Sequence, residues 1–167
     1  STFYQVIKLT DTPVIASHSS CRYFTPGFER NMSDDMIKKL GANGGVIQIT
    51  FGSYFISGDY KQKMADMGKY LKEHNIGRWS KAGKEYFKKF AAENNVDFGS
   101  AELLADHIDH VVKLAGIDHV GFGSDFEGVS DLPADLRDVS SYPNIIYELL
   151  KKGYSEEEIE KICSGNL

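Results

Sequence analysis

Three short apolar segments, separated by long amphipathic patterns, constrain the fold of this chain more than any other feature. They cover residues 13–17, 44–51 and 119–126, and the first two are rich in β-branched residues. Strands that alternate with helices predict parallel βα units. Because parallel sheets are normally covered on both faces, three such strands make a poor sheet on their own. We therefore expect an α/β fold in which residues 1–167 form a single unit, an arc of something larger.

Helical patterns fill the intervals between these strands. Tyr60, Met64, Met67 and Leu71 recur at the spacing of an amphipathic helix, and Ser155 with Glu158 forms the pattern of a reciprocal capping box. The expected helices cover residues 1–8, a segment from Ser33 that stops at Gly41, the stretch around 60–71, and then 80–93, 100–115, 143–152 and 155–163.

Composition and charge exclude several classes of protein. The net charge of −5 argues against a nucleic-acid-binding surface, which needs a basic stripe. No apolar run approaches the roughly 20 residues of a membrane span. The two cysteines, Cys21 and Cys163, are too few for a disulfide scaffold, although a single bridge stays open. The compartment also stays open, exported or cytoplasmic, since any export signal would lie upstream of Ser1.

Three residues are candidates for chemistry because of their places in the pattern. His18 directly follows the first strand and Asp125 ends the third, and the C-terminal ends of parallel strands are where α/β barrels place catalytic groups. A neutral imidazole there is a good metal ligand, and a carboxylate can take a proton from a metal-bound water. Arg30, in the loop after His18, suits bidentate capture of a carboxylate. The plainer alternatives are a capping His, a capping Asp and a solvent-exposed Arg.

Other patterns suggest chemistry that the context disfavours. The sequence DHIDH at 106–110 resembles a metal cluster, but its helix precedes a strand and lies on the outer layer, where local ion pairs explain it better. The glycines of 121–128 mimic a dinucleotide-binding loop, yet Phe126 replaces the third glycine and no helix opens directly behind. A Cys21–His18 nucleophile pair is conceivable, because both residues stand in one loop.

An ordered set of motifs resembles the membrane (renal) dipeptidase family, zinc metallopeptidases of the amidohydrolase type. The motifs are PVIASHSSCR at 13–22, RN at 30–31, GGVI at 44–47, DHIDH at 106–110 and VGFGSDFEG at 120–128. The resemblance runs from Phe3 to Leu167. It implies that the chain is the C-terminal portion of a (β/α)8 TIM-type barrel, with about three parallel strands and their surrounding helices.

The resemblance also implies roles for the three candidate residues. His18 matches a histidine that binds one of two zinc ions, and Arg30 matches the arginine that holds the terminal carboxylate of a dipeptide. Asp125 matches the aspartate that orients the bridging hydroxide and passes its proton to the leaving amine. The substrate would be a dipeptide, and the complete protein would be a homodimer.

The sequence also departs from the family pattern. The first metal pair of the family, a His-x-Asp, is absent, as is the bridging glutamate, and a further zinc histidine would lie upstream of Ser1. The loop between His18 and Arg30 is about one residue longer than usual, and Glu127 replaces a frequent aspartate. We expect both ends to be trimmed, and we expect residues 1–167 alone to bind zinc weakly and to be inactive. Two alternatives remain: a non-catalytic barrel remnant, and a different metal hydrolase of the amidohydrolase type.

Overall fold

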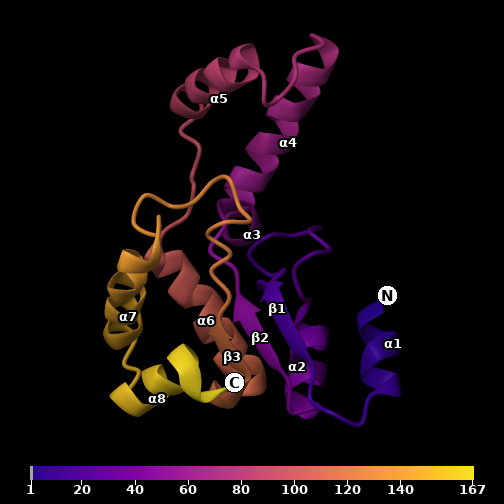
Figure 1. Ribbon diagram of the computed structural model, residues 1–167, viewed down its shortest axis with the longest axis vertical. Coiled ribbons are helices and arrows are strands. Elements are labelled where there is room, and N and C mark those ends of the chain that lie inside the picture. The colour runs from indigo at the N-terminus through magenta and orange to yellow at the C-terminus, as the bar shows by residue number, and fades with distance from the viewer. Residues whose placement is uncertain (1) are drawn as a thin grey trace.

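A parallel three-stranded sheet forms the centre of the computed structural model, which describes residues 2–167 (Figure 1). The strands are β1 (Ile15–Ser19), β2 (Val46–Ile49) and β3 (Val120–Phe122), arranged in the order β1-β2-β3. Residue 15 pairs with 46, and residue 47 pairs with 120. The three predicted parallel strands are confirmed. The second and third strands are shorter than their apolar segments, and β1 is shifted two residues toward the C-terminus relative to its segment.

Helices fill the intervals between these strands, as the sequence predicts. They are α1 (Thr2–Leu9), α2 (Asp34–Ala42), α3 (Ser53–Ile56), α4 (Gly58–Glu73), α5 (Lys81–Glu93), α6 (Ala101–Ala115), α7 (Tyr142–Lys151) and α8 (Glu156–Glu160). Short 3₁₀ turns cover Ile117–His119 and Val139–Ser141, and a π-helical turn covers Lys161–Gly165. The short helix α3 directly after β2 was not predicted. None of the described helices is both long and apolar enough to cross a bilayer.

Serine side chains begin several of these helices. Ser33, Ser80 and Ser100 each accept a hydrogen bond from the backbone three residues later. The capping box of Ser155 and Glu158 is present. The expected end of α2 at Gly41 is wrong, since the helix continues to residue 42. A Cβ at position 41 would lie 2.8 Å from the Ala115 Cβ, so this glycine serves close packing of α2 against α6 rather than helix termination.

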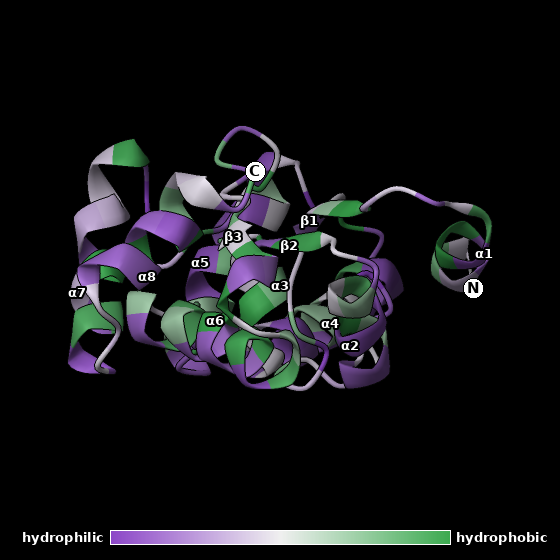
Figure 2. Ribbon diagram, turned by 90° about the horizontal axis from the view of Figure 1, so that it is seen from below, coloured by the Kyte–Doolittle hydropathy of each residue, from purple (hydrophilic) through white to green (hydrophobic). Residues whose placement is uncertain are grey.

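The helices gather on one side of the sheet (Figure 2). The main core lies between the sheet and helices α2, α6 and α7, and its fully buried side chains include Ile37, Leu40, Ile47, Ile49, Leu104, Ile108, Val111, Val120, Ile145 and Leu149. The edge strand β1 is poorly covered, with Ile15 54% exposed. A parallel sheet covered mainly on one face fits the expectation of a barrel arc.

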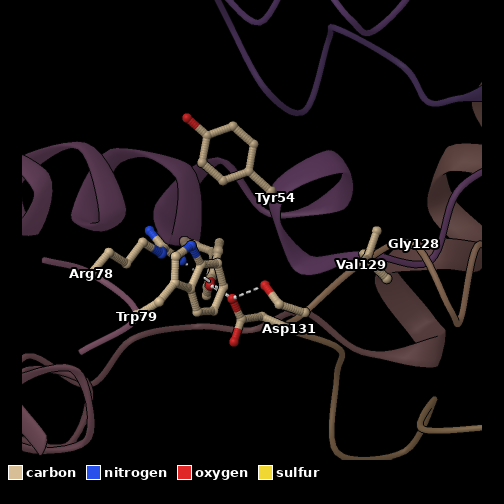
Figure 3. A pocket seen from close by; sticks show the side chains of 9 residues that line it. Tyr54, Arg78, Trp79, Gly128, Val129 and Asp131 are labelled. Carbon is tan, nitrogen blue, oxygen red and sulfur yellow. Dashed lines mark hydrogen bonds and ion pairs between the residues drawn. The ribbon is translucent and has the colours of Figure 1, made fainter. Parts of the chain in front are cut away.

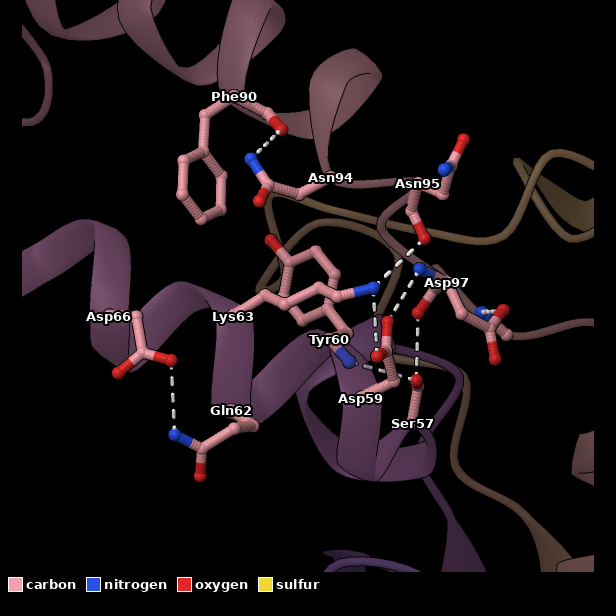
Figure 4. A network of polar contacts seen from close by, with 11 residues as sticks. Ser57, Asp59, Tyr60, Gln62, Lys63, Asp66, Phe90, Asn94, Asn95 and Asp97 are labelled. Carbon is pink, nitrogen blue, oxygen red and sulfur yellow. Dashed lines mark hydrogen bonds and ion pairs between the residues drawn. The ribbon is translucent and has the colours of Figure 1, made fainter.

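A helical hairpin made of α4 and α5 projects beyond the C-terminal ends of the strands (Figure 1). Its own apolar cluster joins the predicted stripe Tyr60, Met64, Met67 and Leu71 to aromatic residues of α5. Polar contacts tie its base together, as Figure 4 shows. Lys63 contacts Asp59 at 2.9 Å, and Asp59 accepts the backbone N–H of Asp97 at 2.9 Å. These contacts join the start of α4 to the segment that follows α5.

Candidate functional site

The loops that follow the three strands meet at one edge of the sheet. Backbone hydrogen bonds continue beyond the strand ends, from Thr50 N–H to the Ser19 carbonyl at 2.9 Å and from Phe51 N–H to the Ser124 carbonyl at 3.2 Å. A further bond joins Ser53 N–H to the Asp131 carbonyl at 2.9 Å. The segments after β1, β2 and β3 are thus held side by side, and side chains far apart in sequence come together.

His18 and Asp125 face each other at this edge. The distance between His18 Nε2 and Asp125 Oδ1 is 3.9 Å, and the two side chains are 48% and 28% exposed. The other ring nitrogen, Nδ1, contacts Ser17 Oγ at 3.1 Å. The sequence predicts that His18 directly follows the first strand, which is wrong. His18 lies within β1, because that strand extends to residue 19. Asp125 likewise lies three residues beyond β3 rather than within it.

The backbone of Asp125 has an unusual conformation. Its φ of 59° lies in the left-handed region, where Asp and Asn are among the few non-glycine residues found. The Asp125 carbonyl accepts the N–H groups of Gly128 at 3.0 Å and Val129 at 3.1 Å, which closes a tight turn. A Cβ at position 128 would lie 2.1 Å from Asp125 Oδ1. Because Gly128 has no side chain, the Asp125 carboxylate can occupy this space. The left-handed backbone conformation of Asp125 is a kind of strain that clusters at functional sites.

Arg30 borders the same open depression as His18 and Asp125, which has a volume of about 430 Å³. The guanidinium lies 5.8 Å from the centre of the Phe55 ring. The backbone around it is fixed, because Ser19 Oγ donates to the Arg30 carbonyl at 3.0 Å and the buried Asn31 amide donates to the Phe55 carbonyl at 2.7 Å. All three predicted site residues are therefore brought to one depression.

The ion pairs expected for the DHIDH motif are confirmed, and His107 is the exception. Asp106 pairs with Lys152 and Asp109 with Lys113, and His110 Nε2 lies 2.9 Å from Asp34 Oδ1. His107 instead is fully buried on the inner face of α6. Its Nδ1 accepts the Cys21 N–H at 3.0 Å, and its Nε2–H donates to the Ile56 carbonyl at 3.1 Å. Burial lowers the pKa of His107 from 6.5 to about 4, so the ring is neutral.

His107 therefore joins the loop after β1 to helix α3 after β2. The sequence could have predicted that His107 is buried, because it falls on the apolar stripe with Leu104, Ile108 and Val111. Within residues 2–167, no group of three or more His, Cys, Asp or Glu side chains could hold a metal ion. The motif therefore has a structural role, in which His107 holds the loop after β1 against helix α3.

The structure does not support a disulfide, a Cys21–His18 nucleophile pair or a dinucleotide-binding loop. Cys21 is buried and Cys163 exposed, and neither forms a disulfide. The Cys21 thiol donates to the His107 carbonyl at 3.3 Å, and burial raises its pKa far above the usual range, so no Cys21–His18 nucleophile pair exists. The glycine-rich segment 121–128 opens no helix, because α7 begins only at Tyr142.

Sequence reasoning missed a second hollow, which lies where the helical hairpin meets the loop after β3. Its walls come from α3, from the connection between α4 and α5, and from the loop after β3, and its volume is about 250 Å³ (Figure 3). Tyr54, Trp79 and Val129 supply apolar surface, and Arg78 contacts Asp131 at 3.4 Å. No local spacing could have revealed it, because the contributing residues are distributed over almost eighty positions of the chain.

Comparison with known proteins places this geometry in a family. The model of the membrane dipeptidase family, peptidase family M19, matches residues 1–167. Curated relatives include an uncharacterised dipeptidase of Schizosaccharomyces pombe, 31% identical over 99% of this chain, and the dipeptidase verJ of Clonostachys rogersoniana, 33% identical over 97% of it. The chain spans about a third of these relatives, 32% of each.

Solved structures show the same arrangement of elements. The probable dipeptidase PvdM of Pseudomonas aeruginosa superposes with a TM-score of 0.77 at 27% identity, over 98% of this chain and 45% of the other. A metallo peptidase of Rhodobacter sphaeroides, liganded with a phosphinate mimic of L-Ala-D-Ala, shares the fold at 24% identity with a TM-score of 0.71, over 98% and 37% of the two chains. With a family model matching its whole length, the chain belongs to the membrane dipeptidase family, peptidase family M19.

Proposed function

We propose that the full-length protein containing this chain is a metal-dependent dipeptidase, with its reaction centre at the depression that His18, Arg30 and Asp125 share. One observation carries the proposal: His18 Nε2 and Asp125 Oδ1 lie 3.9 Å apart at the C-terminal edge of the sheet, with Arg30 beside them. An imidazole, a carboxylate and a guanidinium provide a metal ligand, a proton acceptor and a carboxylate-binding group. Membership of the family supports the proposal.

The donor set fits part of a zinc site. The His18 side chain is 48% exposed, and its Nε2 atom faces a carboxylate oxygen of Asp125 at 3.9 Å. Catalytic zinc sites use about three protein ligands, so the remaining ligands of two zinc ions would come from parts of the protein outside residues 2–167. When bound, zinc lowers the pKa of water and polarises the peptide carbonyl.

His18, Asp125 and Arg30 would then each have a separate role at the scissile bond. His18 would hold the metal through Nε2. Asp125 would accept a proton at its carboxylate and return it to the leaving amine. Arg30 would bind the free carboxylate of the substrate in a bidentate contact and so exclude longer peptides. We also propose that the full-length protein is a homodimer.

Replacing Arg30 tests the assignment as a dipeptidase against another amidohydrolase-type reaction. In the full-length protein, Arg30→Ala should lower kcat/KM for dipeptides about 10- to 100-fold, because a charge-assisted contact contributes about 1.5–3 kcal/mol. Arg30→Lys should retain part of the activity. The matched substrate is the same dipeptide with an amidated C-terminus, which should be cleaved poorly by wild type and unchanged by Arg30→Ala. Equal losses on both substrates would contradict a carboxylate-binding role.

Replacing Gly128 tests whether the position of the Asp125 carboxylate matters. Gly128→Ala should push that carboxylate aside and lower kcat/KM by about 10- to 100-fold, because small displacements of a reacting group are costly. Position 128 is exposed, so the melting temperature should change little. The control is Gly68→Ala in α4, where an added Cβ meets nothing within 4 Å. Retained activity in Gly128→Ala would show that the carboxylate need not occupy this place.

A further inference from the structure

The hollow lined by Tyr54, Arg78, Trp79, Gly128, Val129 and Asp131 has the build of a binding pocket, and we name it the Trp79 pocket (Figure 3). The Trp79 side belongs to the segment between α4 and α5, and the Asp131 side belongs to the loop after β3. The pocket is therefore made by the helical hairpin where it meets the edge of the sheet. Its volume of about 250 Å³ exceeds what a single large side chain requires.

The Trp79 pocket adjoins the Asp125 carboxylate. Gly128 lines the pocket, and a Cβ at that position would lie 2.1 Å from Asp125 Oδ1 and 2.8 Å from its Cγ. Gly128 thus belongs to the wall of the pocket and also lies against the carboxylate. A substrate whose scissile bond lies at Asp125 would reach the pocket across Gly128.

The charges within the Trp79 pocket compensate each other. Asp131 contacts Arg78 at 3.4 Å and accepts hydrogen bonds from Tyr60 Oη at 2.5 Å and Ser130 Oγ at 2.9 Å. The Arg78 guanidinium also lies 5.4 Å from the centre of the Trp79 ring. The two opposite charges face each other, so together they give the pocket no net charge, which suits an uncharged group.

The aromatic surface of the pocket is unusually accessible. Trp79 is 66% exposed and Tyr54 is 37% exposed, whereas large aromatic side chains usually bury most of their area. The hydroxyl of Tyr60, by contrast, is committed to Asp131, and burial raises its pKa above the usual range. The open faces of an indole and a phenol are surfaces on which an apolar or aromatic group stacks.

We propose that the Trp79 pocket binds a large apolar or aromatic side chain of the dipeptide, that of the residue on the amino side of the scissile bond. This inference rests on the proposed function. The side is set by Arg30, which borders the depression with His18 but does not line the Trp79 pocket. The carboxyl-side residue carries the carboxylate that Arg30 would hold, so its side chain stays near Arg30. The amino-side residue lies toward the hairpin.

The test compares substrates that differ in one side chain, using the full-length, metal-loaded protein. Wild type should prefer Phe-Ala and Leu-Ala to Ala-Ala. Trp79→Ala should lower kcat/KM for Phe-Ala and Leu-Ala at least tenfold and for Ala-Ala less than twofold, while Trp79→Phe keeps most of the preference. Tyr147→Ala removes an exposed aromatic residue of α7, which is 61% exposed, and should change none of these ratios.

The outcomes separate this inference from the proposed function. Wild type that cleaves no dipeptide would overturn both. Wild type that cleaves dipeptides, with Trp79→Ala losing equal activity on all three substrates, would overturn the pocket alone. A loss that is confined to Ala-Phe, with the large side chain on the carboxyl side, would also overturn it, because the pocket would then serve the other residue.

Discussion

Replacing Asp125 by asparagine should lower kcat of the full-length protein by about 10²- to 10⁴-fold, the range found when a general acid–base group is removed. The substitution keeps the size of the side chain. It also keeps a residue type that tolerates the left-handed backbone conformation at φ 59°. The fold of the loop and the zinc content should therefore stay unchanged while proton transfer is lost. Steady-state kinetics together with metal analysis of the purified variant measure this.

The matched control for this prediction is Glu127→Gln in the same loop. Glu127 is exposed and loses one negative charge in the same way, but it does not border the depression shared by His18 and Arg30. Its kcat should stay within about twofold of wild type, because surface substitutions away from a site have small effects. Equal losses in both variants would point to loop charge in general and would refute a specific role for Asp125.

Lowering the pH should destabilise the protein through His107, a buried residue that has no part in the proposed chemistry. Burial depresses its pKa from 6.5 to about 4 in the folded state, so the unfolded chain takes up the proton first as pH falls. The neutral ring contributes fully above pH 6.5, and stability is lost progressively between pH 6.5 and 4. The depression corresponds to about 3 kcal/mol of unfolding free energy.

Thermal unfolding of the full-length protein at pH 7 and pH 4.5 measures this effect, with a chelator present so that metal release adds nothing. His107→Gln should unfold at a lower temperature than wild type at pH 7, because one of the buried contacts to Cys21 and Ile56 is lost. Its melting temperature should also fall less between the two pH values. His110→Gln, on the same helix, should keep the pH dependence of wild type. An unchanged pH dependence in His107→Gln would be evidence against a buried neutral ring.

Local physical rules account for the elements that the sequence predicted well. The helix starts at Ser33, Ser80, Ser100 and Ser155 were readable, since a serine cap satisfies backbone N–H groups that any helix leaves free. The apolar stripe from Tyr60 to Leu71 could be predicted because the spacing of a helix is visible within one segment of sequence. Strand ends were less accurate, because the regular pairing of β3 ends at Phe122 and only single backbone hydrogen bonds continue to Ser124. An apolar pattern does not record where pairing stops.

The sequence by itself determined the parallel βα order, the caps and the candidates His18, Arg30 and Asp125, because each follows from local pattern or from the rule that strand C-termini meet at one edge. Only the tertiary structure decided which residues touch across long sequence distances. It placed His107 between the loop that holds Cys21 and helix α3, which ends at Ile56, and it built the Trp79 pocket from three separate segments. Contacts of this kind arise when helices and loops pack together, and packing depends on the whole chain.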